Sequence, residues 1–221
     1  MKKFCLYFMV FLVSAINSKI FAQDTINVYS RKSIPIENVI GNNRQYLQII
    51  VNKPLSDNKK NGILSISSFA ADYRKELSQN EYLTTVAFYQ KVCKGLSANL
   101  GSTFNSKSGL RSFAGLQYYY EDKILSLFYL PGYYFINSQM LSNLLAIEVK
   151  PKISKHWSVY SRFQATYAYD FENNCHYRSY MYTRLGLNYQ KYSFGVASNL
   201  DWYGKYKSHK ENYGLFFTLH L

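Results

Sequence analysis

The sequence predicts an all-β protein, a single antiparallel up-and-down barrel that spans a membrane. Three observations favour this class: long strands with a period of two, aromatic residues gathered at strand ends, and an apolar leader too short to cross a bilayer as a helix. Strands of soluble proteins are usually about five or six residues long, whereas a tilted membrane strand needs about ten. We expect about twelve strands (ten to twelve fit the pattern), with both termini in the periplasm.

The hairpin at 141–171 shows the period most clearly. In its first arm Leu145, Ile147 and Val149 alternate with Glu148 and Lys150. In its second arm the odd positions from 163 to 171 are apolar or aromatic, and most even positions from 158 to 170 are polar. This alternation is typical of strands with one face in lipid and the other in a polar lumen.

The first 22 residues have the features of a secretory signal peptide, with Lys2 and Lys3 before a short apolar run and cleavage expected after Ala22. Residues 45–221 carry eleven clear strand patterns and form the predicted barrel. Residues 23–44 are open between a first strand, which Lys32 and Pro35 weaken, and a periplasmic or plug segment. An even strand count favours the strand.

Finer features of the barrel are also predicted. The strand at 63–74 has an ambiguous face, which suggests a bulge. The shorter connections, such as 152–158, should lie in the periplasm and the longer ones outside. Cys93 and Cys175 fall at opposite ends of the barrel and should not form a disulfide.

Composition narrows the function classes. The whole chain has 26 basic and 13 acidic residues, and loss of the leader with its three lysines leaves an excess of ten positive charges. That charge would attract lipid phosphates or anionic solutes, or would simply solvate the loops. The basic residues are scattered in an exported chain, so we expect no nucleic-acid partner. No later stretch is long and apolar enough for a transmembrane helix.

The final strand, NYGLFFTLHL, places five apolar or aromatic residues on one face: Tyr213, Leu215, Phe217, Leu219 and Leu221. It resembles the C-terminal recognition strand of bacterial outer-membrane barrels, in which the last residue is usually aromatic rather than leucine. The resemblance implies the outer membrane of a Gram-negative bacterium, contact with its lipid, and recognition by the barrel assembly machinery.

The predicted lumen is charged. Alternation turns five charged residues of consecutive strands inward, namely Glu148, Lys150, Arg162, Arg184 and Asp201. They could form a charged constriction or a salt-bridge network that fills the lumen. Inward Tyr119, Tyr134, Tyr180 and Tyr182 would narrow the passage. Aromatic residues at strand ends predict the membrane interfaces: Trp157 and Tyr189 at one, and Tyr167, Tyr169, Trp202 and Tyr203 at the other.

The sequence offers little for catalysis. Outer-membrane lipid hydrolases resemble one another in a His-x-Ser pair on a lipid-facing strand, and here such a pair occurs only at His156-Trp157-Ser158, in a turn without an orienting partner. Cys175-His176 has no second ligand pair for a metal. We therefore assign no catalytic residue, metal or cofactor.

Three functions remain open. The favoured hypothesis is a small pore for small polar solutes. The alternatives are a non-conducting structural or partner-binding barrel and, less favoured, a lipid hydrolase.

Overall fold

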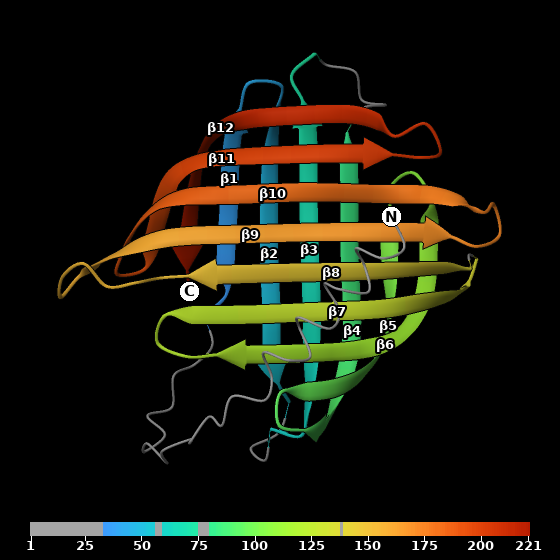
Figure 1. Cartoon of the computed structure of the whole chain (residues 1–221), viewed down its shortest axis with the longest axis horizontal. Coiled ribbons are helices and arrows are strands. Elements are labelled where there is room, and N and C mark those ends of the chain that lie inside the picture. Colours follow the sequence, from blue (N-terminus) through green and yellow to red (C-terminus); the bar gives the residue numbers. More distant parts are fainter. Residues whose placement is uncertain (1–32, 56–58, 75–79, 138) are drawn as a thin grey trace, which may run out of the picture. The chain divides into compact units, whose positions relative to one another are not determined.

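The computed structural model describes residues 33–55, 59–74, 80–137 and 139–221, which form a closed antiparallel barrel (Figure 1). Each strand pairs with its neighbours in sequence, and β1 pairs with β12 to close the ring. This confirms the predicted fold class and strand count. The strands are β1 (Pro35–Gly41), β2 (Arg44–Pro54), β3 (Asn61–Asp72), β4 (Glu81–Cys93), β5 (Leu96–Asn105), β6 (Gly109–Glu121), β7 (Leu125–Ile136), β8 (Met140–Val149), β9 (Trp157–Asp170), β10 (Cys175–Tyr189), β11 (Tyr192–Tyr203) and β12 (Ser208–His220).

The two faces of the barrel wall differ in polarity. Outward side chains are largely apolar, with Phe88 61% and Leu215 65% exposed, while inward Asn199, Asp201 and Asn212 are fully buried. Soluble monomers rarely expose so continuous an apolar surface, and a membrane barrel requires one. In Figure 1 the strands of the front wall cross those of the back wall, as they do when barrel strands are inclined to the axis.

No part of the described chain forms a helix long and apolar enough to cross a membrane.

Strand β1 settles part of the open N-terminal question. It lies within residues 23–44, and Pro35 is its first residue, a position at which a strand tolerates the missing N–H. Ile36 lies opposite Leu219 and Ile40 opposite Leu215, so the C-terminal strand has partners on both sides. Residues 23–32, like the expected signal peptide at 1–22, lie outside the described residues.

The predicted bulge at 63–74 is wrong. Strand β3 keeps an unbroken register with β2 and β4. Its face looked ambiguous because Leu64 and Ile66 point inward and pack with Leu130, so part of the lumen is apolar. Register shifts occur instead on other pairs, between Lys91 and Cys93, Ser112 and Phe113, and His176 and Arg178.

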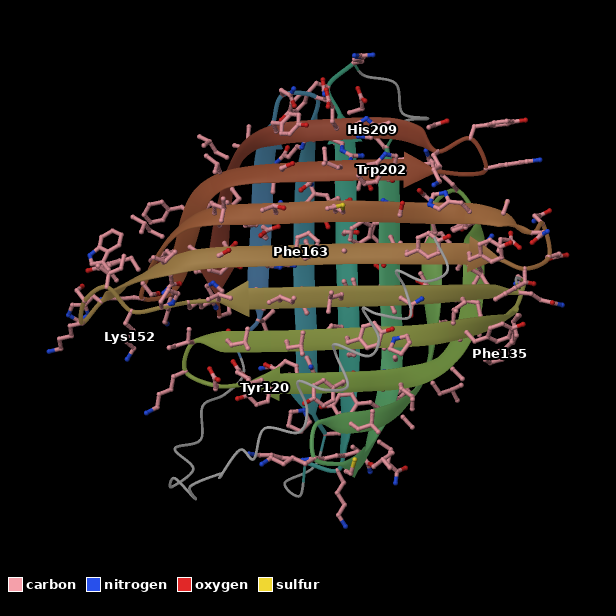
Figure 2. The ribbon with its side chains drawn as sticks, viewed as in Figure 1. Tyr120, Phe135, Lys152, Phe163, Trp202 and His209 are labelled. Atoms are coloured by element: carbon pink, nitrogen blue, oxygen red, sulfur yellow. The ribbon has the colours of Figure 1, made fainter. Side chains whose placement is uncertain are left out.

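The loop-length argument also fails. The first residue of β1 and the last residue of β12 lie at the same end of the barrel. The connection at 150–156 lies on that end and is among the longest. The turn at 42–43 lies on the opposite end and is among the shortest. Figure 2 labels Lys152 and Phe135 at the two opposite ends. The start of β1 and the end of β12 share an end because the strand number is even. That this end is periplasmic stays a prediction.

The prediction for the cysteines is confirmed. Cys93 ends β4 and Cys175 begins β10, at opposite ends of the barrel, and both are free thiols.

The close approach of β10 and β11 gives a stability prediction. Gly186 lies opposite Gly195, and a Cβ added to Gly186 would lie 2.0 Å from the Phe194 carbonyl oxygen. Gly186→Ala should force the strands apart and lower the free energy of unfolding by about 1–3 kcal/mol. Urea unfolding of the barrel refolded in detergent measures this. Thr183→Ala, on the lipid face of the same strand, is the control, and equal midpoints for the two variants would contradict the prediction.

Candidate functional site: the charged lumen and its cavity

The structure places the five predicted lumen charges in three groups. Arg162, Arg184 and Asp201 point inward, with exposures of 7%, 2% and 0%. Glu148 lies opposite Arg162 in the strand register, and Arg162 lies opposite Arg184. Asp201 instead lies opposite Tyr180, four residues along β11 from the residue opposite Arg184. The five residues therefore do not form one ring.

The first region centres on Glu37 of β1, a buried carboxylate. Arg184 donates to Glu37 Oε1 from Nε at 3.1 Å and from Nη2 at 2.8 Å, a two-bond guanidinium–carboxylate pair. Arg162 Nη1 lies 3.4 Å from Glu37 Oε2. A buried carboxylate needs such partners, because burial without them costs several kcal/mol. We call Glu37, Arg162 and Arg184 the Glu37 cluster.

Neutral side chains complete the Glu37 cluster. Arg162 Nη2 donates to Gln48 at 2.6 Å and also to Gln164, and Arg184 Nη1 donates to Asn199 at 2.7 Å. These residues lie on β2, β9 and β11, so the two guanidinium groups join strands that are distant in the sequence.

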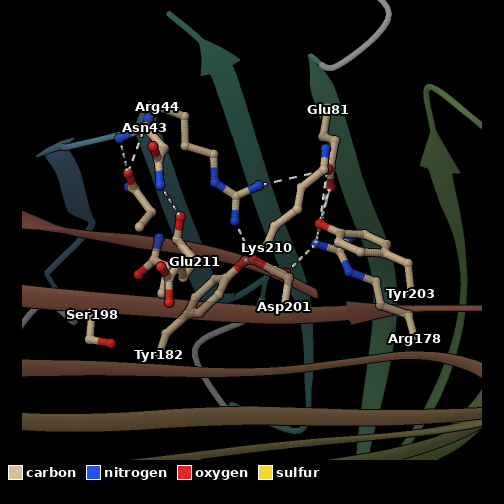
Figure 3. Close-up of polar contacts among 12 residues, drawn as sticks. Asn43, Arg44, Glu81, Arg178, Tyr182, Ser198, Asp201, Tyr203, Lys210 and Glu211 are labelled. Carbon is tan, nitrogen blue, oxygen red and sulfur yellow. Dashed lines mark hydrogen bonds and ion pairs between the residues drawn. The ribbon is translucent and has the colours of Figure 1, made fainter. Parts of the chain in front are cut away.

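The second region centres on Asp201 of β11 (Figure 3). Asp201 accepts hydrogen bonds from Arg44, from Arg178 at 2.9 Å and from the Tyr182 hydroxyl at 3.0 Å. Glu81 of β4 lies beyond, within 3.3 Å of Arg178 and 3.6 Å of Arg44. We call Asp201, Arg44, Arg178 and Glu81 the Asp201 cluster. It ties β2 and β4 to β10 and β11, which lie on opposite walls.

Tyr203 corrects one sequence prediction. We expected it at the membrane interface, but its hydroxyl donates to both carboxylate oxygens of Glu81 at 2.8 Å, and its ring faces Arg178 at 4.9 Å. The physical reason is the period of two, since Tyr203 shares the inward face of Asp201. Trp202, between them, points outward and packs on His209 at the rim.

The other predicted interface aromatics lie on the outer face. The Trp157 and Tyr189 rings are 4.7 Å apart at one end. At the other end Tyr167 is 48% exposed, and Tyr169 packs on Phe171.

Glu148 and Lys150 form a separate ion pair at the end of β8, on the barrel end where β1 starts and β12 ends. Tyr160 donates to Glu148 at 2.9 Å, and the Lys150 ammonium lies 5.3 Å from the Tyr160 ring. Both charged side chains are partly exposed, at 24% and 31%.

Sequence reasoning missed the partners Glu37, Arg44, Glu81 and Arg178. Glu37 and Arg184 are 147 residues apart in sequence, and Arg44 and Asp201 are 157 apart. Strand parity could have turned Arg44 inward with Tyr46, but no local pattern names a partner across the lumen. Glu37 and Arg44 lie in the open segment 23–44, and Glu81 and Arg178 lie just before the strands predicted at 82–91 and 179–189.

A cavity of about 130 Å³ occupies the lumen beside these clusters. It is bounded on one side by Arg178, Tyr180 and Tyr182, and it extends to Ser108 in the turn after β5. Ile66, Leu130 and Leu144 line its inner part, and Leu64 and Phe128 pack beneath them. The cavity therefore reaches one end of the barrel and meets an apolar layer at its other side.

The sequence pair His156 and Ser158 is not brought together. Ser158 is buried on the lumen side opposite Asn188, whereas the His156 ring packs near outward-facing Tyr189. Within the described ranges no group of three His, Cys, Asp or Glu side chains converges as metal ligands would.

Another serine–histidine pair was not foreseen. His176 Nε2 lies 3.0 Å from Ser179 Oγ, and His176 Nδ1 lies 2.9 Å from the carbonyl oxygen of Gly204. The register shift at residue 177 turns both side chains to the outer face, where His176 contacts the Tyr167 ring. A sequence search for His-x-Ser misses this pair because the bulge adds one residue.

No family model and no curated protein matches the chain. Among solved structures, the chain is similar to a KdgM porin, with 12% identity over 86% of this chain and 99% of that chain and a TM-score of 0.48. A NanC porin has 11% identity over 86% of this chain and 98% of that chain, with a TM-score of 0.48. LpxR from Salmonella typhimurium has 7% identity over 86% of this chain and 100% of that chain, with a TM-score of 0.44.

The Glu37 cluster gives a stability prediction. Glu37→Gln leaves two buried guanidinium groups without their carboxylate, so the free energy of unfolding should fall by about 3–5 kcal/mol. Urea unfolding followed by fluorescence of Trp157 and Trp202 measures the loss. Glu172→Gln removes an exposed carboxylate and is the control, and Arg184→Met added to Glu37→Gln should recover part of the loss. A Glu37→Gln barrel as stable as the control would show that the cluster does not hold the wall.

Proposed function

We propose that this protein is a small outer-membrane pore that passes small polar solutes through its lumen, with a preference for anions. The observation that carries the proposal is the cavity inside the closed barrel. It is lined by polar side chains such as Thr85, Thr103 and Thr166 and reaches the rim at Ser108. A lumen built only as a packed core would not retain this space.

The charge of the lumen supports anion preference. Seven basic side chains there and at the rim pair with four carboxylates, an excess of three positive charges. Rings of Arg and Lys favour anions in pores. The basic set is Arg44, Lys107, Lys150, Arg162, Arg178, Arg184 and Lys210, and the acidic set is Glu37, Glu81, Glu148 and Asp201.

The geometry also suggests the route. The Glu37 and Asp201 clusters lie mainly on β1, β2 and β9–β11, and Glu81 joins them from β4. Solutes would therefore pass between β10 and the side formed by β3 and β5–β8. The apolar layer of Leu64, Ile66, Leu130 and Phe128 lies on that route and would act as a hydrophobic constriction, which gates by loss of water.

Enlarging the constriction tests this route. Phe128→Ala with Leu130→Ala should raise single-channel conductance several-fold in a planar bilayer, because both side chains face the lumen. The wild type should give small, discrete, anion-preferring steps. Leu127→Ala with Tyr129→Ala removes similar side chains from the lipid face of the same strand and should leave conductance unchanged.

Silence from folded wild type and from the enlarged variant would contradict a pore. It would favour the alternative of a non-conducting structural or partner-binding barrel. The observation that favours this alternative is the presence of two buried charge clusters, which join different parts of the wall and would make it rigid.

A lipid hydrolase is a second candidate, and it rests on His176 and Ser179. A carbonyl oxygen can only accept, so the contact with Gly204 makes Nδ1 the donor and leaves Nε2 to accept the Ser179 proton. Such a serine could attack a lipid ester, with the proton passing through His176 to the departing alkoxide before water releases the acyl group. The pair lies on the outer face near a rim.

Fatty-acid release from phospholipid–detergent micelles tests the hydrolase. Under this hypothesis Ser179→Ala should lower release at least about 100-fold, since it removes the nucleophile. Thr183→Ala, on the same face without a histidine neighbour, should retain the activity. A wild-type barrel that is folded but releases no fatty acid ends the hypothesis.

A further inference from the structure

Arg111 differs from the other arginines of the lumen. Arg44, Arg162, Arg178 and Arg184 each pair with a carboxylate. The Arg111 side chain lines the cavity, and its Nε and Nη1 atoms are buried without a hydrogen-bond partner in the part of the chain that the structure describes. Leaving buried donors of a charged group without hydrogen-bond partners costs free energy. Two such donors on one guanidinium group in a cavity therefore indicate a binding place for an anion.

A nearby carboxylate does not fill this role. Asp170 is close enough to interact electrostatically with Arg111, but its oxygens are used by the following turn. They accept from the backbone N–H groups of Glu172 at 2.9 Å and Asn173 at 3.1 Å, and from the Asn173 amide at 2.9 Å. Asp170 thus moderates the local charge and leaves the Arg111 donors unpaired.

Tyr177 holds the guanidinium group in place. The Arg111 guanidinium carbon lies 4.8 Å from the Tyr177 ring centre. Tyr177 is the residue skipped in the pairing of β10 with β9, and bulges of this kind re-aim a side chain. The Gly204 N–H donates to the Tyr177 carbonyl at 2.8 Å and fixes the bulge. The guanidinium group is therefore positioned by aromatic stacking rather than by an ion pair.

The rest of the cavity suits a flat organic body. Tyr134 and Tyr180 line it together with Tyr177, and the Arg178 Nε atom is a further buried donor without a partner. The Tyr134 hydroxyl is hydrogen-bonded to Thr103 at 3.0 Å, which orients its ring. A volume of about 130 Å³ has room for roughly ten water-sized groups.

We propose that Arg111 and the tyrosines around it form a recognition site for a small organic carboxylate with a flat body of about ten non-hydrogen atoms. The carboxylate binds the free donors of Arg111, and the body lies against Tyr134, Tyr177 and Tyr180. This names the solute class of the proposed pore, but binding at the site does not depend on conduction.

Benzoate and benzamide test the site in the full-length barrel folded in detergent. They share a ring and size and differ in charge. Isothermal titration calorimetry should detect benzoate binding and at least tenfold weaker benzamide binding. Arg111→Gln should weaken benzoate binding at least tenfold, whereas Arg74→Gln, an equal charge change in an exposed connection, should not.

Stability separates a recognition role from a structural one. Because Arg111 lacks a carboxylate partner, Arg111→Gln should unfold in urea at the same or a higher midpoint than the wild type. A lower midpoint together with weaker binding would assign Arg111 to the fold and overturn the proposal.

Two further outcomes would also overturn it: no benzoate binding up to about 50 mM, or equal binding of benzoate and benzamide. Inorganic phosphate that binds as tightly as benzoate would show that the site recognises negative charge alone. That result would contradict recognition of a carboxylate with a flat body. A barrel that binds benzoate but does not conduct would reject the pore and retain the site.

Discussion

Closure of the barrel between β1 and β12 is the constraint on which the rest of the structure depends. A bilayer offers no water to an open strand edge, so every backbone donor and acceptor at membrane depth must be paired within the wall. The short strand Pro35–Gly41 supplies that pairing along the apolar C-terminal strand. It also carries Glu37, so the step that closes the wall brings a carboxylate to Arg162 and Arg184. Closure and charge pairing are therefore linked in one strand.

The lumen divides as a result. Carboxylates on β1, β4 and β11 form ion pairs with the arginines of β2, β9 and β10 in two buried clusters. These ion pairs neutralise most of the charge of the clustered side chains. The cavity lies between β10 and the opposite side of the barrel, and its lining is mostly aliphatic, hydroxyl and tyrosine side chains together with Arg111 and Arg178. A solute would meet a polar entrance and an apolar constriction there, and the clusters would act on it mainly through their excess positive charge.

The sequence predicts the wall better than the lumen. A period of two depends on each residue and its neighbours, so it locates strands such as Leu96–Asn105 and turns Arg162 and Arg184 inward correctly. The sequence does not decide strand β1, because Lys32 and Pro35 weaken the strand pattern of residues 23–44. The partners of Arg184 and Asp201 could not be predicted, since the pairing joins residues about 150 positions apart. Tyr203 could have been placed correctly by the same parity that turned Asp201 inward.

The bulge at Tyr177 explains two residue pairs that sequence reasoning missed. One skipped residue at Tyr177 turns its ring toward Arg111 and places His176 and Ser179 on one outer face. Strict alternation would separate these pairs, so no reading by parity could find them. The same logic separates the arginines by role. Arg162 and Arg184 share a buried carboxylate, and both ion pairs join strands of the wall. Arg111 is stacked on Tyr177, and its Nε and Nη1 donors are buried without a partner among the described residues, which costs the fold stability. The proposed carboxylate ligand, rather than the barrel wall, would supply the partner for these donors.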